Sequence, residues 1–172
     1  MKTSAAVIQA GARKWRPGGK VFEIREDDLS GDQTRSLLAL HLSGMHAASP
    51  PENVFALDLT GLQVPEITVW TAWRGGHVAS VGAIKMLPNG GAEVKSMRTH
   101  PEFIRQGAAA ALLDKIIGVA RSRGVKRLSL ETGSGDAFEP ALALYRRRGF
   151  ANGAAFGEYK ATAYNQFLHL DL

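Results

Sequence analysis

A run of small residues near the middle of the chain has the composition of a phosphate-binding turn. Residues 96–113 read SMRTHPEFIRQGAAAALL, so a strand-like segment is followed by Gly107 and four alanines that begin a helical pattern. A helix N-terminus carries unpaired N–H groups and the positive end of the helix dipole, and small side chains let a diphosphate approach that backbone closely. The same residues also suit an ordinary strand-to-helix turn, because alanine favours helices. Taken alone, the segment leaves both interpretations open.

Other kinds of site have little support. The 172 residues include no cysteine, which excludes disulfides, thiolate metal sites and a cysteine nucleophile. His41 and His46 are five residues apart, a spacing that does not place two ligands on one helix face. We therefore expect no metal site. The lack of cysteine is compatible with a reducing cytoplasm, where we expect the protein to lie.

The elements that must position this segment follow from the periodicity of apolar residues. Alternating apolar residues and glycine-containing turns predict a meander of three antiparallel strands before it. Apolar residues at helical spacing from Ala109 to Ala120 predict an amphipathic helix that ends near Gly124. A strand, a second helix and closing strands follow, which predicts a mixed α/β domain. The expected strands span 20–25, 67–73, 77–86, 92–99, 126–132, 156–159 and 166–170, and the expected helices run from about 30 to 46, 109 to 124 and 136 to 149, with a short helix or turn at 54–59.

Side-chain types at the element ends make the fold prediction more specific. Either Ser30 or Asp32 could cap the first helix, because both residue types accept hydrogen bonds from free backbone N–H groups. Asp136 and Glu139 have the spacing of a capping box for the last helix. The expected core contacts of the first strand are Val21 and Ile24.

The net charge of +5 is concentrated at the N-terminus. Residues 1–20 hold five basic residues and no acid, which leaves 16 basic and 16 acidic residues in the remainder. A nucleic-acid groove needs the excess on the domain itself, so we expect no nucleic-acid partner, although the N-terminal segment could act as an electrostatic arm. No apolar run approaches the ~20 residues of a membrane helix. We therefore expect a flexible basic leader at 1–19 and one domain at 20–172 that binds no membrane.

Two motifs resemble those of the GNAT superfamily of acyl-CoA-dependent N-acyltransferases. The first, Arg/Gln-x-x-Gly-x-Gly/Ala between a strand and a helix, aligns with Ile104, Gly107 and Ala109. The second, A-x-x-L-Y-x-x-x-G-F, is present as ALALYRRRGF at 141–150. The sequence departs from the family pattern at Ile104, where Arg or Gln is usual, and at Phe138, where Asn is frequent. The order of elements is similar to the GNAT fold over nearly the whole expected domain.

The resemblance implies an antiparallel meander followed by β-α-β-α-β, in which the fourth and fifth strands splay into a V that holds acetyl-CoA. It also implies direct attack of an acceptor amine on the thioester in a ternary complex, with a fixed donor for the developing oxyanion. Tyr145 falls where the family has a tyrosine that protonates the leaving thiolate, although it also suits a core aromatic. The implied cofactor contacts are Met97, Arg98, Thr99, Arg105, Gln106, Gly107, Ala108, Ala109, Ala110 and Phe138.

The proton acceptor for the amine is less defined. Glu93 and Glu131 lie on the two strands expected to line the cleft, and we favour Glu93 as the catalytic base. Each carboxylate could instead be solvated or form a salt bridge, for example with Lys95 or Arg127. Arg98, if it points into the acceptor pocket, could hold a substrate carboxylate through two hydrogen bonds, and a surface or structural role is equally open.

The favoured function is acetyl transfer from acetyl-CoA to a primary amine on a small molecule. A protein N-acetyltransferase is an alternative that the sequence does not separate from it. A catalytically silent acyl-CoA sensor is another, motivated by the departures at Ile104 and Phe138. The acceptor and the acyl-chain length stay undefined, and a homodimer is left open.

Overall fold

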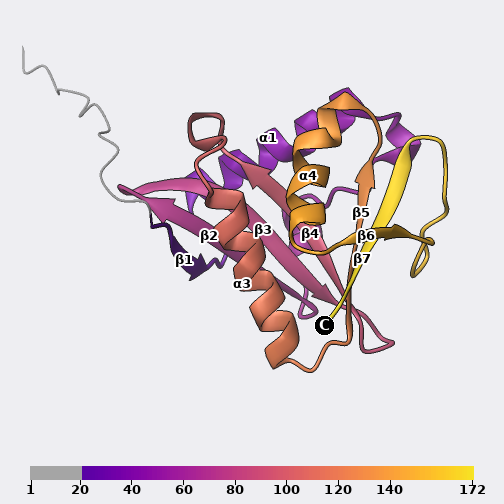
Figure 1. Ribbon diagram of the computed structural model, residues 1–172. Helices are drawn as coiled ribbons and strands as arrows, with labels where there is room; N and C mark the ends of the chain where they lie inside the picture. The colour runs from indigo at the N-terminus through magenta and orange to yellow at the C-terminus, as the bar shows by residue number, and fades with distance from the viewer. Residues whose placement is uncertain (1–20) are drawn as a thin grey trace, which may run out of the picture.

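A seven-stranded mixed sheet runs through residues 21–172, the part of the chain that the computed structural model describes (Figure 1). The strand order is β1-β2-β3-β4-β5-β7-β6. Neighbouring strands are antiparallel except β4 and β5, which are parallel. The predicted leader at 1–19 lies outside the described residues. The strands are β1 (Glu23–Glu26), β2 (Ile67–Arg74), β3 (His77–Met86), β4 (Ala92–Thr99), β5 (Arg127–Gly133), β6 (Ala151–Gly153) and β7 (Asn165–Asp171).

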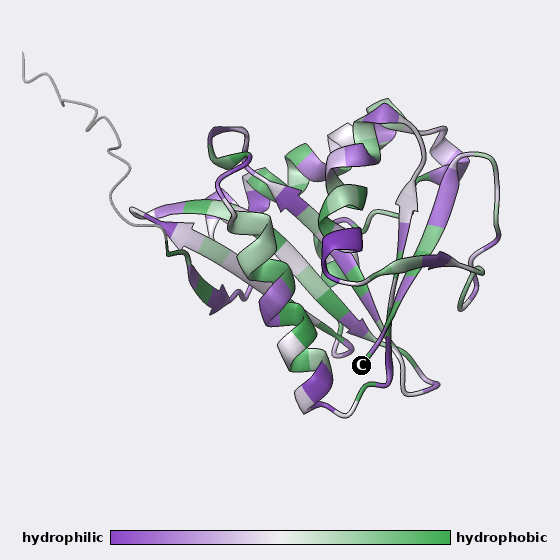
Figure 2. Cartoon of the chain, in the orientation of Figure 1, coloured by the Kyte–Doolittle hydropathy of each residue, from purple (hydrophilic) through white to green (hydrophobic). Residues whose placement is uncertain are grey.

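Helices cover both faces of this sheet (Figure 1). On one face, Leu112 and Ile116 pack with Leu142 in the largest apolar cluster. On the other face, Leu37 and Leu38 pack in a second cluster. Figure 2 shows hydrophobic residues along the middle of the sheet and on the helix that follows β4. Within residues 21–172, no helix is long and apolar enough to cross a membrane. The helices are α1 (Asp32–Ala48), α2 (Leu59–Leu62), α3 (Ala108–Ser122) and α4 (Glu139–Arg147), with single 3-10 turns η1 (Pro51–Asn53), η2 (Pro101–Phe103) and η3 (Asp136–Phe138).

The predicted meander and the helix after it are confirmed. β2 and β3 join through Gly75 and Gly76, both at positive φ, which glycine adopts without the steric cost of a Cβ. In α3 the buried side chains recur at helical spacing, as predicted. The mixed α/β fold class is likewise confirmed, because the meander is followed by α3, β5, α4 and the closing strands.

The first strand was placed slightly too early. It begins at Glu23, and Val21, an expected core contact, is 83% exposed. Phe22 is buried instead, at 8% exposure, and Ile24 packs against the core. Residues 22 and 24 share one face of an extended chain, so the core face has the opposite parity to Val21.

Both helix-cap predictions were wrong. The residue before α1 is Gly31, without a side-chain cap, and the Ser30 hydroxyl donates to Asp28 at 2.6 Å instead. Asp136 begins the 3-10 turn η3, and α4 starts at Glu139 without a side-chain cap. The chain is already turning before α4 begins, so the capping box does not form.

One closing strand was also misplaced. β7 includes the predicted 166–170, but 156–159 is not a strand, and β6 lies earlier, at Ala151–Gly153. Residues 154–164 form a connection in which Phe156 and Tyr159 pack against Phe167. This connection carries Tyr159 back toward β4, where it contributes to the site described next.

Candidate active site

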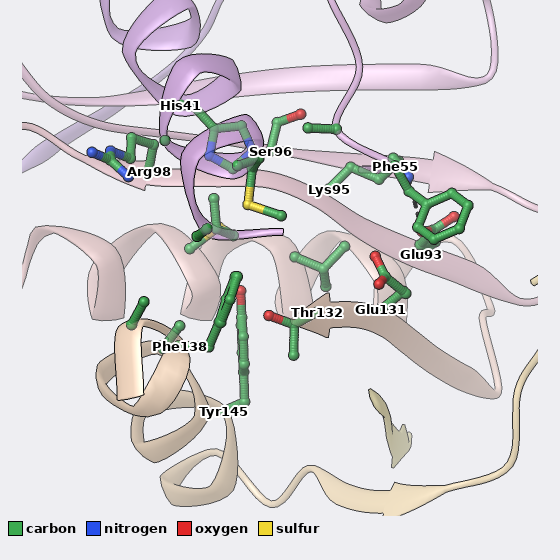
Figure 3. Close-up of a pocket in the computed structure, with 18 residues that line it drawn as sticks. His41, Phe55, Glu93, Lys95, Ser96, Arg98, Glu131, Thr132, Phe138 and Tyr145 are labelled. Atoms are coloured by element: carbon green, nitrogen blue, oxygen red, sulfur yellow. Dashed lines mark hydrogen bonds and ion pairs between the residues drawn. The ribbon is translucent and has the colours of Figure 1, made fainter. Parts of the chain in front are cut away.

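The sheet opens where its two parallel strands diverge. β4 and β5 pair at only two positions, Ala92 with Leu128 and Glu93 with Ser129. Beyond them the strands continue to Thr99 and Gly133 without pairing, which leaves the β5-side edge of β4 unpartnered. The predicted splay between the fourth and fifth strands is therefore present. A cavity of about 200 Å³ occupies the opening, between α1 on one side and α4 on the other (Figure 3).

Strain in β4 lies directly at this opening. Ser96 has φ of 56°, a left-handed conformation that costs a non-glycine residue about 1–3 kcal/mol. The pairing with β3 shifts register here, because Val81 faces Arg98 while Ala83 faces Lys95. The Ser96 hydroxyl is buried and has no hydrogen-bond partner among the described residues. Strain and an unsatisfied polar group together are typical of a functional site.

A network of buried charge lines the α1 side of the cavity. Glu93 is 3% exposed and accepts hydrogen bonds from Lys95 at 3.0 Å and from the Tyr159 hydroxyl at 2.5 Å. Lys95 also donates to the Tyr159 hydroxyl at 2.8 Å. Burial and the Glu93 charge raise the pKa of Tyr159. The predicted base is therefore held in an ion pair, the alternative that the sequence left open.

Glu131 faces the same cavity from β5 and has a different electrostatic environment. Burial raises its pKa to about 7, with a contribution from Glu93, while Lys95 acts in the opposite direction. A carboxyl group with this pKa exchanges protons near neutral pH.

The pKa of His41, on α1, is lowered, whereas that of Glu131 is raised. Burial, together with the nearby charges of Arg98 and Lys95, lowers the pKa of His41 to about 4. Its imidazole is therefore neutral at pH 7.

The opposite side of the cavity is mostly apolar. Tyr145 extends from α4 toward the opening, is 6% exposed, and packs its ring 5.8 Å from that of Phe150. Burial raises the pKa of Tyr145, so its hydroxyl is protonated at neutral pH. The buried ring of Phe138 lies beside it (Figure 3) and contacts Gly133, where a Cβ would collide with that ring.

The predicted phosphate-binding turn leads into α3. Gly107 precedes the helix at φ of 91°, and a Cβ there would meet nothing within 4 Å, so the space above it is open. The first backbone bond of α3 joins the Ala111 N–H to Gly107, which leaves the N–H groups of Ala108, Ala109 and Ala110 available to an anion. A diphosphate therefore fits this turn.

The structure places the predicted residues in two groups, with Thr99 in neither. Glu93, Met97, Arg98, Phe138 and Tyr145 line the cavity. Thr99 lies outside the cavity, with its hydroxyl 3.3 Å from that of Ser80. The remaining predicted cofactor contacts lie at the start of α3 and in the preceding turn: Arg105, Gln106, Gly107, Ala108, Ala109 and Ala110.

Several residues of the site were not predicted, among them Ser96 and His41 in the cavity and Tyr159 beside it. Nothing in the sequence marks Ser96, because only the fold forces a serine into a left-handed conformation. His41 sits on a helix whose contact with β4 is a tertiary feature. Tyr159 was assigned to a strand, although its spacing from Phe156 could equally have indicated an aromatic loop.

Comparisons with known proteins agree with this geometry. Residues 33–150 match the acetyltransferase (GNAT) family model. The chain is 41% identical over 152 residues to the uncharacterized N-acetyltransferase YedL of Escherichia coli (strain K12), covering 88% of this chain and 96% of that protein. It is 48% identical over 138 residues to the uncharacterized N-acetyltransferase YsnE of Bacillus subtilis (strain 168), covering 80% of this chain and 91% of that protein.

Solved structures share the fold. A Klebsiella pneumoniae chain assigned as an acyl-CoA N-acyltransferase is 25% identical, with a TM-score of 0.75, and the match covers 90% of this chain and 99% of that one. A Bacillus subtilis acetyltransferase in complex with CoA is 19% identical, with a TM-score of 0.66, and the match covers 88% of this chain and 99% of that one. The family model spans more than half of the chain, and the relatives exceed 30% identity over most of their length. The chain therefore belongs to the GNAT family of acetyltransferases.

Proposed function

We propose that the protein transfers an acetyl group from acetyl-CoA to a primary amine of a small molecule, by direct attack within a ternary complex. The observation that carries this proposal is the opening between β4 and β5, which has titratable carboxyl groups on one side and the Tyr145 hydroxyl on the other. An amine can enter from the charged side while a thioester lies along the free edge of β4. The family membership supports the same reaction class.

The residues at the two ends of the opening fit acetyl-CoA, which supplies an acetyl group bound as a thioester. The N–H groups of Ala108, Ala109 and Ala110 would hold the diphosphate, with Gly107 leaving room for it. Backbone groups of β4 from Ser96 to Thr99 would bind the pantetheine, because no strand pairs with them on that side. The left-handed Ser96 turns this stretch of backbone and helps to position a donor for the oxyanion.

We propose that Glu131 takes the proton of the acceptor amine. An amine is largely protonated at neutral pH, so a base must act before its nitrogen can form the new bond. Glu131, with its pKa near 7, can accept that proton directly or through a water molecule. Glu93 stays a candidate, but its ion pair with Lys95 and its bond from Tyr159 occupy one of its oxygens. In this assignment the Glu93 charge raises the basicity of Glu131.

Tyr145 is the proposed source of the proton for the leaving thiolate. The amine nitrogen forms its bond to the acetyl carbon, the carbon–sulfur bond breaks, and sulfur takes the hydroxyl proton, while the second proton that the nitrogen loses on forming the amide restores the tyrosine hydroxyl. The raised pKa keeps the Tyr145 hydroxyl protonated before the reaction. Phe138 and Phe150 keep water away from its ring, so the proton is available to the sulfur in an apolar setting.

The small volume of the cavity and the contacts beside it favour a small acceptor over a protein. The Asn53 side chain donates to Thr162 at 2.9 Å, which ties η1 to the connection before β7. Phe55 and Tyr159 pack edge to face, with ring centroids 5.1 Å apart, beside the charged side. These contacts lie beside the end where the acceptor would enter, and the whole cavity, which would also hold the acetyl group, has a volume of only about 200 Å³.

Titration calorimetry with acetyl-CoA, followed by thiol release with a panel of amines, tests this function. We expect saturable binding, and release with at least one class of small amine. Binding without release from any small amine would favour the silent sensor or a protein acceptor. Gly107→Glu supplies the control, because a carboxylate at a left-handed glycine would repel the diphosphate and strain the turn. Unchanged acetyl-CoA affinity in that variant would refute the binding turn.

A further inference from the structure

Among residues 21–172, no acid neutralises the Arg98 side chain on the charged side of the cavity. Lys95 pairs with Glu93 at 3.0 Å. Arg98 lines the same cavity and is partly buried, yet within residues 21–172 it forms no ion pair and no side-chain hydrogen bond. Buried or partly buried guanidinium groups usually have an anionic partner. A ligand is therefore the natural source of that anion.

The strained backbone of β4 is what brings Arg98 to this side. In a regular strand, residues 95 and 98 would point to opposite faces of the sheet. The register shift at Ser96 instead places Lys95 opposite Ala83 and Arg98 opposite Val81. Val81 and Ala83 are two residues apart and pack in the same cluster under α1. Arg98 and Lys95 therefore both project toward α1.

α1 makes room for the guanidinium group. A Cβ added to Gly44 would lie 3.1 Å from Nη1 of Arg98, closer than ordinary packing allows. Glycine inside a helix is unfavourable, so its presence at this point has a structural use. His41, one turn earlier, also lines the cavity, and its imidazole is neutral at pH 7. This end of the cavity therefore carries a net positive charge.

The two ends of the charged side carry side chains of opposite charge type. Figure 3 shows Arg98 and His41 together at one end and Glu131 at the other. The positive end suits a carboxylate or phosphonate, which a guanidinium group binds through two parallel hydrogen bonds. The Glu131 end suits an ammonium group that is about to lose its proton. A molecule with both groups would satisfy both ends.

We propose that the acceptor is an amino acid-like molecule whose amine and anionic group lie on the same small skeleton, and that Arg98 binds the anionic group. This inference rests on the acetyl-transfer function proposed above and specifies its substrate class. Arg98 is in this view a specificity-determining residue, and acetyl-CoA binding does not depend on its side chain.

Matched acceptors provide the first test. Amino acids with a free carboxylate, the same amino acids as C-terminal amides, the corresponding decarboxylated amines and aminoalkylphosphonates are compared by thiol release from acetyl-CoA. We expect kcat/KM to be at least about tenfold higher for the best anionic acceptors than for their neutral counterparts, the minimum expected for a lost charged hydrogen-bond pair. Equal or faster acetylation of the amides and neutral amines would overturn the inference.

Substitution of the arginine provides the second test. Arg98→Gln should raise KM for the anionic acceptor at least about tenfold and remove the preference over the amide, since both charged hydrogen bonds are lost. Arg98→Lys should recover part of the preference, because it restores the charge without the two-pronged geometry. Arg121→Gln, on an exposed arginine in the last turn of α3, is the control and should leave both constants unchanged. A weaker acetyl-CoA affinity in Arg98→Gln, with the acceptor preference intact, would assign Arg98 to the cofactor and overturn the inference.

Two further measurements guard against a folding defect. Gly44→Ala should crowd the guanidinium group and weaken acetylation of the anionic acceptor more than that of its amide. In nuclear magnetic resonance titrations, Arg98→Gln should raise the pKa of His41, because one of the charges that lowers it is gone. An unchanged His41 pKa would place the guanidinium group away from the pocket and contradict the assignment.

The outcomes also separate this inference from the function on which it rests. Acetylation without regard to acceptor charge would overturn the Arg98 assignment alone. Failure to bind acetyl-CoA would overturn the proposed function itself. Binding of acetyl-CoA without thiol release from any panel member would overturn the small-molecule acceptor, and with it the substrate class.

Discussion

The two sides of the cavity between β4 and β5 are built from different chemistry. The α1 side holds Glu93, Lys95, Arg98 and Glu131, whereas the α4 side holds aromatic and aliphatic groups together with the hydroxyls of Tyr145 and Thr132. On the first side burial raises the pKa of Glu131, and the charges of Lys95 and Glu93 act on it in opposite directions, while on the second side burial alone raises the pKa of Tyr145. The difference teaches that one small opening provides two electrostatic environments, so that in the proposed mechanism proton removal from the acceptor and proton delivery to sulfur take place in different ones.

Removing one partner of the buried ion pair on the charged side should lower the free energy of unfolding far more than removing one partner of an exposed ion pair. Lys95→Met leaves Glu93 buried without its cation, and we expect a loss of about 3–5 kcal/mol in the free energy of unfolding. Arg127→Met is the matched control: its pair with Asp171 is 59% and 74% exposed, against 9% and 4% for Lys95 and Glu93. Its expected loss is below about 1 kcal/mol. Chemical denaturation measures both, and equal losses would contradict the distinction.

Loss of the proposed base should have the next largest effect. Glu131→Gln removes the proton acceptor, and we expect kcat/KM to fall about 10²–10³-fold with acetyl-CoA affinity unchanged. Wild-type kcat/KM should rise with pH through about 7, as Glu131 ionises, and this step should be absent from the variant. Glu93→Gln is the companion substitution. A larger loss there than in Glu131→Gln would return the role of base to Glu93.

Loss of the tyrosine hydroxyl on the apolar side should lower kcat and leave the other measured properties unchanged. Tyr145→Phe removes the hydroxyl without changing the packing against Phe150, and we expect kcat to fall about 100-fold. This is at the low end for general acids, because a buried hydroxyl gives up its proton reluctantly. Acetyl-CoA affinity and thermal stability should match those of the wild type. Wild-type turnover would remove Tyr145 from the mechanism.

The smallest expected effect is a pH dependence of stability from Glu131. Its folded pKa of about 7 lies above the ordinary value of 4.5, so its contribution to stability is fully present below about 4.5 and is lost as pH rises through 7. Relative to Glu131→Gln, the wild type should therefore lose roughly 1–2 kcal/mol between pH 5 and pH 8, a value reduced for partial solvent exposure. Parallel stability curves for the two proteins would show that the pKa is not raised.

Local patterns in the sequence predicted most of the elements, and long-range contacts explain most of the errors. The meander and α3 were predictable because glycine turns and the helical repeat from Ala109 to Ala120 are local signals. Residues 156–159 were assigned to a strand from their composition. Their actual role depends on Phe167 and Glu93, which are adjacent only after folding.

For the candidate site, the motifs pointed to the turn at Gly107 and to Tyr145, because the small residues of that turn and the spacing of the helix motif are encoded in consecutive residues. The same reasoning favoured Glu93 over Glu131, but it had no local basis for that choice. Both residues are carboxylates on strands expected to line the cleft. Their difference lies in burial and in the position of Lys95 and Tyr159. These are properties of the assembled sheet.

The amino-acid sequence by itself determined the class of fold, the glycine turn before α3 and the family to which the chain is similar, because each depends on spacing along the chain. Only the tertiary structure decided how the charged residues divide their roles. The left-handed Ser96 turns Arg98 toward α1, Gly44 admits it, and Lys95 pairs with Glu93 while Glu131 retains a pKa near 7. The physical reason is that burial and electrostatic interaction depend on distances through space, which the fold sets and the order of residues does not reveal.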